Sequence, residues 1–392
     1  MARTRMVTLA RAAVLVAALA AAAAGADAEE PLKVGAVLEV SGPFASIARQ
    51  IENGMRLYMM RNGDPVSGRK VELIVKDATG AQPEIAKRLV QELITRDKVD
   101  FIVGFGLTPN ALAAAPVVTE AKIPTIIMNA AASVIVSKSP YMARVSMTLP
   151  QVTMPIAQWA ANNNIRRVYT LVADYGPGLD AEATFKKYFT AAGGQIIGEV
   201  RTPLKNPDFA PFVQRIKDAQ PEAVFIFLPA GEQGIAFMKE YRQRGLADAG
   251  IRLIGTGDVV EDDILEAIGD AALGAITTHH YSAAHDSPRN REYVKAYTDA
   301  FKIRPNFMSV AGYDGMAVVY EVTRRLNGRI DAERAMEIIK GMRIDSPRGS
   351  IMIDPATRDV VQDVYVRRVE KRDGALYNIE FDRISNVKDP EH

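Results

Sequence analysis

The strongest constraint in this sequence is a regular alternation of short apolar segments with longer segments whose apolar residues recur at helical spacing. Residues 32–38 read LKVGAVL, and the segment 47–61 that follows has helical periodicity. The next short apolar segments, again separated by amphipathic stretches, are 71–75, 101–103 and 125–128. Apolar strands alternating with amphipathic helices are typical of a parallel β-sheet covered on both faces. The first part of the chain is therefore predicted to form a doubly wound α/β lobe.

The same alternation begins again after Pro150. The expected strands of this second series are 168–172, 195–200, 223–228 and 253–255. No low-complexity linker separates the two series, so we expect two successive α/β lobes joined by strand-like crossovers. Near the C-terminus, residues 360–369 and 377–381 flank the turn signal Asp373-Gly374. They predict a β-hairpin that adds to a sheet already formed.

The first 28 residues differ in character from the rest of the chain. Arg3, Arg5 and Arg11 precede an uncharged, Ala-rich run at 12–26 that ends in small residues. This arrangement is typical of a secretory signal peptide. A transmembrane anchor is the alternative, but the run is shorter than the roughly 20 residues that a bilayer requires. Because the chain has no cysteine, a lipoprotein anchor is excluded, and we expect export to a bacterial periplasm.

Charge and composition exclude several classes of function. The chain has 48 basic and 47 acidic residues, so it lacks the strongly positive charge expected of a nucleic-acid-binding protein. The absence of cysteine excludes thiol catalysis, iron–sulfur clusters and cysteine-ligated zinc. No nucleophile elbow or P-loop is present, and Gly104-Phe105-Gly106 lacks the third glycine of a dinucleotide site. We therefore expect no enzyme, no catalytic residue and no cofactor.

The histidines offer one possible metal site. His279, His280 and His285 lie close together in the sequence, without the spacing of a helical zinc motif. We expect this segment to be a loop near the junction of the lobes, and we predict no metal site.

Polar loops follow several of the predicted strands. In an open α/β sheet, ligands bind at the edge formed by the carboxyl ends of the strands. Four small polar loops have backbone N–H groups at helix N-termini, which favour an anionic group. They are residues 41–46, 106–110, 129–133 and 173–176. The first three belong to the first lobe and the fourth to the second, so two facing lobes would enclose a cleft.

Segments across the whole mature chain resemble the periplasmic solute-binding proteins of the leucine/isoleucine/valine-binding type, which serve ABC importers. The resemblance rests on the order and spacing of segments such as KVGAVLEVSGPFASIARQIENGMRLYM, IPTIIMNAAAS, ADYGPGLDAEATFKKYF and GYDGMAVVYE. It implies the type I periplasmic binding fold, in which two doubly wound parallel-sheet lobes are joined by three hinge crossovers. Such lobes close on a ligand in the cleft between them.

The resemblance also implies where the lobes divide. The crossovers are expected at residues 145–150, 278–283 and 351–357. After a signal peptide at 1–28, the first lobe would comprise residues 29–147 plus 281–352, and the second would comprise 148–280 plus 353–392.

Position by position, the resemblance implies a set of ligand-binding residues. Ile47 stands where leucine binders carry an aromatic lid residue, Thr108 is expected to hold a ligand carboxylate, and Asp258 a ligand ammonium. The other expected contacts come from loops of both lobes: Asn129, Ala131, Ser133, Tyr175, Ala230 and Tyr281. Alternative roles remain, since Thr108 and Asn129 could cap helices and Tyr175 could be a packed surface tyrosine.

The expected ligand is a small hydrophobic carboxylate. Ile47 and Ala131 make the site more apolar than is common in the family, which leaves two ligand classes open. One is a branched-chain amino acid, and the other is an aromatic or aliphatic acid without an amine. The expected partner is the membrane permease of an ABC importer, with the binding protein itself a monomer. A sensory binding protein that reports to a membrane receptor is one alternative. The other is an enzyme in which Asp258 and the 279–285 histidines share a metal.

Overall fold

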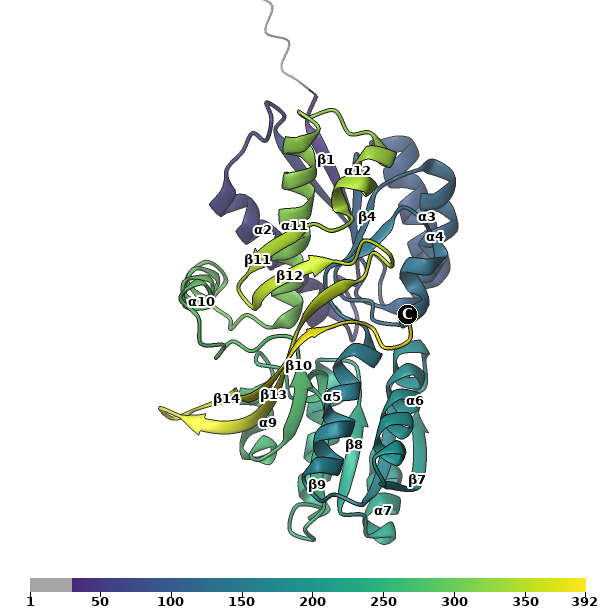
Figure 1. Cartoon of the computed structure of the whole chain (residues 1–392), viewed down its shortest axis with the longest axis vertical. Helices are drawn as coiled ribbons and strands as arrows, with labels where there is room; N and C mark the ends of the chain where they lie inside the picture. The colour runs from purple at the N-terminus through teal and green to yellow at the C-terminus, as the bar shows by residue number, and fades with distance from the viewer. Residues whose placement is uncertain (1–29) are drawn as a thin grey trace, which may run out of the picture.

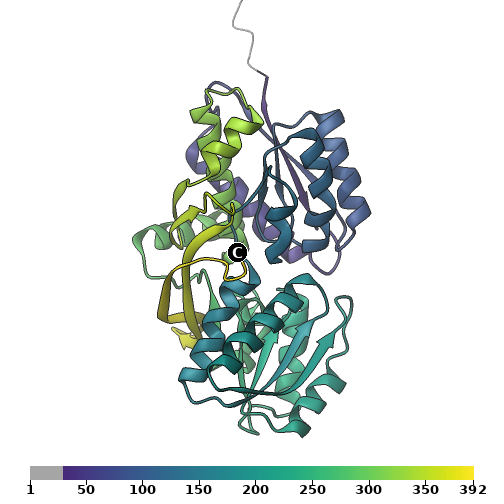
Figure 2. The same ribbon diagram turned by 45° about the vertical axis from the view of Figure 1, so that its right-hand side comes forward.

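The structure is a computed structural model that describes residues 30–392, so the predicted signal peptide at 1–28 lies outside the described residues. Two α/β lobes are stacked along the long axis of the molecule, and the C-terminal strands run along one side of them (Figures 1 and 2). This arrangement confirms the predicted fold class. None of the helices within residues 30–392 has the length and apolar character needed to cross a membrane.

The first lobe is built on a sheet of five parallel strands in the order β2-β1-β3-β4-β5. Its strands are β1 (Leu32–Leu38), β2 (Val71–Asp77), β3 (Phe101–Gly104), β4 (Thr125–Ile127) and β5 (Met142–Arg144). Its helices are α2 (Ala45–Asn62), α3 (Pro83–Glu92), α4 (Thr108–Ala121), α10 (Pro288–Phe301), α11 (Phe307–Arg325) and α12 (Ala332–Ile339). A π-helical turn, Leu93–Asp97, extends α3, and a 3-10 turn, Ser133–Lys138, follows β4.

Both faces of this sheet are covered, because side chains along each strand point alternately to opposite sides. Val37 and Ile102 belong to a core formed with α3 and α4. Ala36 and Val103 belong to the core on the other face, which includes residues of α2 and α11. The near-continuous apolar strands in the sequence therefore do mark a sheet buried on both sides.

The second lobe repeats this plan with five parallel strands in the order β10-β9-β8-β6-β7. They are β6 (Arg167–Ala173), β7 (Gln195–Thr202), β8 (Ala223–Phe227), β9 (Arg252–Thr256) and β10 (Ile276–His279). Its helices are α5 (Leu149–Asn162), α6 (Gly176–Ala191), α7 (Ala210–Ala219), α8 (Glu232–Gln243) and the short α9 (Leu265–Ile268). Residues of α5 and α6 join one core, and residues of α7 and α8 join the core on the opposite face.

The C-terminal hairpin consists of β13 (Val360–Arg372) and β14 (Ala375–Val387), and both strands are longer than predicted. Its two-residue turn has Asp373 at φ 51° and Gly374 at φ 84°, which is the left-handed geometry that a tight hairpin favours. β13 pairs with β10 on one side and with β12 (Gly349–Ile353) on the other, and β12 pairs with β11 (Arg343–Ser346). The hairpin thus extends an existing sheet, as predicted.

On the expected division, the chain passes between the lobes in three connections, which correspond to the segments between elements at residues 145–148, 280–287 and 354–359. They are held to neighbouring elements by hydrogen bonds. The Ser146 carbonyl accepts from Gln362 Nε2 (2.8 Å) and Arg348 Nη1 (3.1 Å). The expected boundary near residue 352 is blurred, because β12 pairs with β13 while Ser346 donates to Asp314 of α11 (2.8 Å). The division into lobes at that point stays a prediction.

Candidate ligand-binding site

A small cavity of about 20 Å³ is lined by loops of both lobes, next to the carboxyl ends of several strands. Seven of the nine residues expected from the sequence line it: Ile47, Thr108, Asn129, Ala131, Tyr175, Ala230 and Asp258. Ligand pockets usually have volumes of roughly 300–1,000 Å³. The lobes are closed on each other here, so a ligand could enter only after they move apart.

The first-lobe wall of the cavity is formed by the N-terminus of α4 and the loop after β4. Thr108 is the first residue of α4, and its Oγ1 accepts a hydrogen bond from the backbone N–H of Ala132 (3.2 Å). Asn129 Nδ2 donates to the Gly106 carbonyl (2.7 Å), while Asn129 Oδ1 is buried without a hydrogen-bond partner among residues 30–392. The α4 terminus has no side-chain cap, so its backbone N–H groups and positive dipole end favour an anion.

Glu39, directly after β1, lies behind this wall and is fully buried. Its Oε1 accepts hydrogen bonds from Asn110 Nδ2 (2.7 Å) and from the backbone N–H of Leu107 (3.3 Å). Its Oε2 has no hydrogen-bond partner within the described chain. Burial raises the pKa of Glu39 to about 7, against the opposing effect of the hydrogen bond from Asn110. Glu39 therefore fixes the loop that carries Thr108, and sequence reasoning missed it.

The second-lobe wall is aromatic. Tyr175 directly precedes α6, and its ring stacks on Phe227, with centroids 6.1 Å apart and planes inclined by 20°. Burial raises the pKa of Tyr175 well above its usual value, and the negative charge of Asp258 adds to the effect. Tyr175 is therefore a neutral phenol facing the cavity. Phe227 was missed, although its place as the last residue of β8 is a signal that could have found it.

Asp258 supplies the acidic group of this wall. It lies just after β9 and is 5% exposed. Its Oδ2 accepts a hydrogen bond from Thr256 Oγ1 (2.8 Å) and lies 3.5 Å from His279 Nε2. Burial lowers the pKa of His279 more than the neighbouring carboxylate raises it, so this histidine is neutral near pH 7. Asp258 therefore faces the cavity without a permanently charged partner at its carboxylate.

Contacts between the walls show how closely the lobes meet. The Ser133 backbone N–H donates to Asp180 Oδ2 of α6 (2.9 Å). Gly231, at the N-terminus of α8, has φ +103°, and a Cβ atom there would lie 2.7 Å from Ser46 Oγ of the first lobe. A side chain at position 231 would therefore obstruct closure as well as strain the backbone.

Two expected contacts are absent from the cavity lining. The Ser133 hydroxyl turns away to donate to Asp389 Oδ2 (2.5 Å) near the C-terminus. Tyr281 is fully buried in the connection after β10, where its hydroxyl donates to Asn290 Oδ1 (3.0 Å). Ser133 follows β4 and Tyr281 follows β10, as expected, but the side chains of both residues point away from the cavity. Met147, Leu149 and Pro177 line the cavity without having been singled out.

The histidines at 279–285 do not gather at one point. His279 and His280 are fully buried, and His285 Nδ1 instead lies 2.8 Å from Glu380 Oε2 on β14. Within residues 30–392, the group of side chains spaced to hold a metal ion is a different one, Asp359, Asp389 and His392. The geometry therefore does not favour a metal shared by Asp258 and the 279–285 histidines.

Comparison with known proteins agrees with this architecture. Residues 31–375 match the periplasmic binding protein family. The chain is 42% identical over 388 residues to the Leu/Ile/Val-binding protein homolog 6 of Brucella melitensis, which covers 98% of this chain and 99% of that relative.

Two solved structures combine a similar fold with a bound ligand. One is a solute-binding protein of an ABC transporter from Rhodopseudomonas palustris BisB5 in complex with 3,4-dihydroxybenzoic acid. It is 53% identical, with a TM-score of 0.90 over 92% of this chain and 99% of that one. The other, also from R. palustris, is in complex with 4-hydroxybenzoate and is 40% identical, with a TM-score of 0.89 over 93% and 99%. With this fold, this cleft and these relatives, the chain belongs to the periplasmic binding protein family.

Proposed function

We propose that this protein is the periplasmic solute-binding component of an ABC importer for hydroxylated aromatic carboxylates such as 4-hydroxybenzoate. The observation that carries the ligand class is the pairing of two unlike walls around one cavity. The α4 terminus with Thr108 favours a carboxylate, whereas the stacked Tyr175 and Phe227 favour a flat apolar ring. The ligands of the two R. palustris proteins combine these two chemical features.

Asp258 selects between the two ligand classes left open by the sequence. A carboxylate accepts hydrogen bonds and can take either a phenolic O–H or an ammonium. The aromatic pair beside Asp258 favours the phenol, so we assign Asp258 to the ring hydroxyl and no longer to an ammonium. A charge-assisted hydrogen bond of this kind contributes about 1.5–3 kcal/mol.

The role in import follows from hinge closure. A ligand that contacts both walls stabilises the closed form over the open one, and a membrane permease can then recognise that closed surface. The binding protein acts as a monomer in this proposal. A sensory protein that reports the same closure to a receptor uses the same site, so the ligand experiment below applies to either role.

The test is a thermal-shift panel on residues 29–392, unfolded and refolded first to remove any retained ligand. The panel compares 4-hydroxybenzoate, 3,4-dihydroxybenzoate and benzoate with leucine, isoleucine and valine. A ligand at 100 times its Kd stabilises the protein by about 2.7 kcal/mol, which gives a readable rise in Tm. We expect the hydroxybenzoates to give the largest shift. A shift with the amino acids alone would refute the proposed ligand class.

A further inference from the structure

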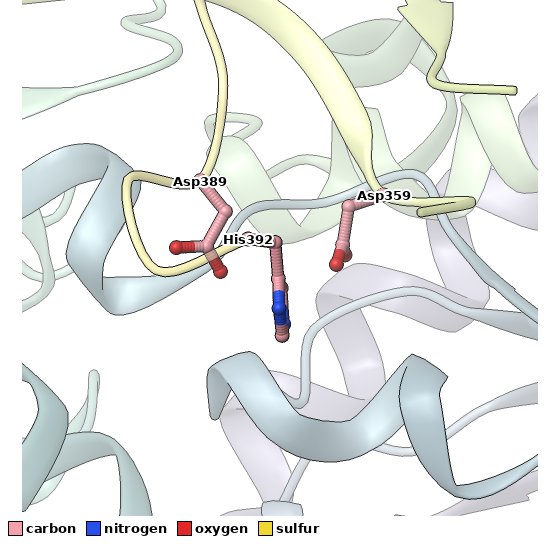
Figure 3. A group of neighbouring side chains, drawn as sticks. All are labelled: Asp359, Asp389 and His392. Carbon is pink, nitrogen blue, oxygen red and sulfur yellow. The ribbon is translucent and has the colours of Figure 1, made fainter. Parts of the chain in front are cut away.

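A second site of interest lies outside the ligand cavity, where the end of the chain meets the third connection between the lobes. Asp359 is the last residue before β13, and Asp389 and His392 lie in the tail after β14. Each can offer one ligand atom such that all three atoms lie within 4.8 Å of one another. Figure 3 shows the His392 ring between the two carboxylates, with all three side chains directed toward the same space.

Asp359 is the unusual member of this group. It is 2% exposed, and neither of its carboxylate oxygens accepts a hydrogen bond from any described residue. Within the described residues its ion-pair partner is Arg144 of β5, whose Nε lies 3.0 Å from Oδ1. Oδ2 is thus a buried carboxylate oxygen without a hydrogen-bond partner in the described chain. Buried carboxylate oxygens normally accept a hydrogen bond or bind a cation, so this oxygen is available as a ligand for a cation.

The space beside these three side chains is large enough for an ion. A cavity of about 180 Å³ is lined by all three side chains. Lys388, which also lines this cavity, is paired with Asp354 Oδ2 (2.6 Å). His392 Nε2 lies 3.0 Å from the Ser133 hydroxyl and 3.1 Å from the Ser133 carbonyl.

We propose that Asp359, Asp389 and His392 form a binding site for a divalent cation of the zinc type. Two carboxylates and one imidazole are ligands that zinc accepts, with water in the fourth position. Ligand atoms around a tetrahedral zinc ion are roughly 3.3 Å apart at bond lengths of about 2 Å. A small inward movement of the tail, whose His392 is exposed, brings the three atoms to that spacing.

The site ties the tail to the loop that lines the ligand cavity. Asp389 Oδ2 accepts from the Ser133 hydroxyl, and Ser133 follows Ala131 of the cavity wall by two residues. The Ser133 N–H in turn donates to Asp180 of the opposite lobe. A bound cation therefore fixes the C-terminal tail beside the point where the lobes meet.

The chain has few histidines, so substitutions can identify the imidazole that binds zinc. The chain has four histidines, and His279 and His280 are fully buried. Zinc binding that depends on an accessible imidazole must therefore use His285 or His392. The protein is prepared without a histidine tag, treated with EDTA and titrated with ZnCl₂ by calorimetry.

We expect one zinc ion per chain and a rise in Tm on zinc addition without any aromatic acid. His392→Ala should weaken binding by more than the roughly 10–100-fold that loss of an outer-shell partner costs, and His285→Ala should leave it unchanged. Asp389→Asn should also weaken binding, and it leaves the buried Asp359–Arg144 pair intact. With zinc, the site is overturned by the absence of saturable one-to-one binding or by binding that survives His392→Ala. Calcium binding that survives His392→Ala while zinc does not bind would equally overturn it.

Discussion

Each wall of the ligand cavity contains a buried acidic residue, but only one of the two residues lines the cavity. Glu39 stands behind the first-lobe wall, with one oxygen bound to Asn110 and the Leu107 N–H. Asp258 stands in the second-lobe wall itself and lines the cavity. In the proposed function, the first acid holds the backbone that receives the ligand carboxylate, and the second presents a side chain that can distinguish ligands. The proposal therefore assigns anchoring to one lobe and selection to the other.

The largest expected effect is the contribution of Glu39 to the pH dependence of the free energy of unfolding. Its pKa rises from 4.5 in the unfolded chain to about 7 in the folded protein, so the folded state holds its proton more tightly. The contribution of this group to stability is therefore complete below about pH 4.5 and is lost as the pH rises through about 7, by about 3 kcal/mol. Denaturant unfolding of wild type and Glu39→Gln between pH 4.5 and 8 measures it.

Glu39→Gln should flatten that part of the pH dependence, because the amide does not titrate. Asp77→Asn is the matched control, since Asp77 is a half-buried acid at the end of the neighbouring strand β2 and its pKa is lowered. If wild type and Glu39→Gln lose stability in parallel across this range, the pKa of Glu39 is not raised in the fold and this prediction is wrong.

The next effect concerns the aromatic wall. Tyr175→Ala removes the ring that stacks on Phe227, and we expect affinity for 4-hydroxybenzoate to fall by about 2 kcal/mol, roughly 30-fold. Calorimetric titration measures the Kd. Tyr188→Ala changes a partly buried tyrosine on α6, the helix that follows Tyr175, and this residue does not line the cavity, so the variant should bind normally. Equal losses in both variants would show that α6 stability, and not stacking, determines affinity.

Asp258→Asn tests selection directly. Wild type should prefer 4-hydroxybenzoate over benzoate, and the variant should lose about 1.5 kcal/mol of that preference, roughly tenfold, because the charged acceptor is gone. The ratio of the two dissociation constants is the measurement. The same substitution should leave benzoate affinity nearly unchanged. A matching loss for both ligands would place Asp258 among the residues that maintain the wall.

The smallest expected effect is a loss of ligand affinity at the wall that is proposed to bind the ligand carboxylate. Thr108→Val removes one hydroxyl while the α4 backbone N–H groups remain, so every ligand in the panel should lose about 1 kcal/mol, roughly fivefold. Thr119→Val is the control, because that hydroxyl bonds to Ala115 and Ser139 at the far end of α4. A loss confined to hydroxylated ligands would reverse the assignment of the two walls.

Much of the cavity lining was predicted, several of its loops from strand ends and its individual residues from the family resemblance. Thr108, Asn129 and Asp258 follow parallel strands, and the carboxyl ends of such strands meet at one edge of each sheet. Ser133 and Tyr281 satisfy the same rule, yet they bond to Asp389 and Asn290 instead. The position of a residue after a strand predicts its neighbourhood, whereas the direction of its side chain depends on partners that are distant in the sequence.

The sequence by itself determined the two lobes and most of their strands and helices, because apolar periodicity reports which faces are buried, and its resemblance to known segments indicated the family. It did not predict β5, β10, β11 or β12, which are strands of three to five residues. Only the tertiary structure decided which side chains meet. Glu39 reaches behind a loop about 70 residues further along, Tyr175 pairs with Phe227, and Asp359 gathers with the tail residues Asp389 and His392. Such contacts join segments with no local signal of each other, and they form only when the packed lobes bring those segments together.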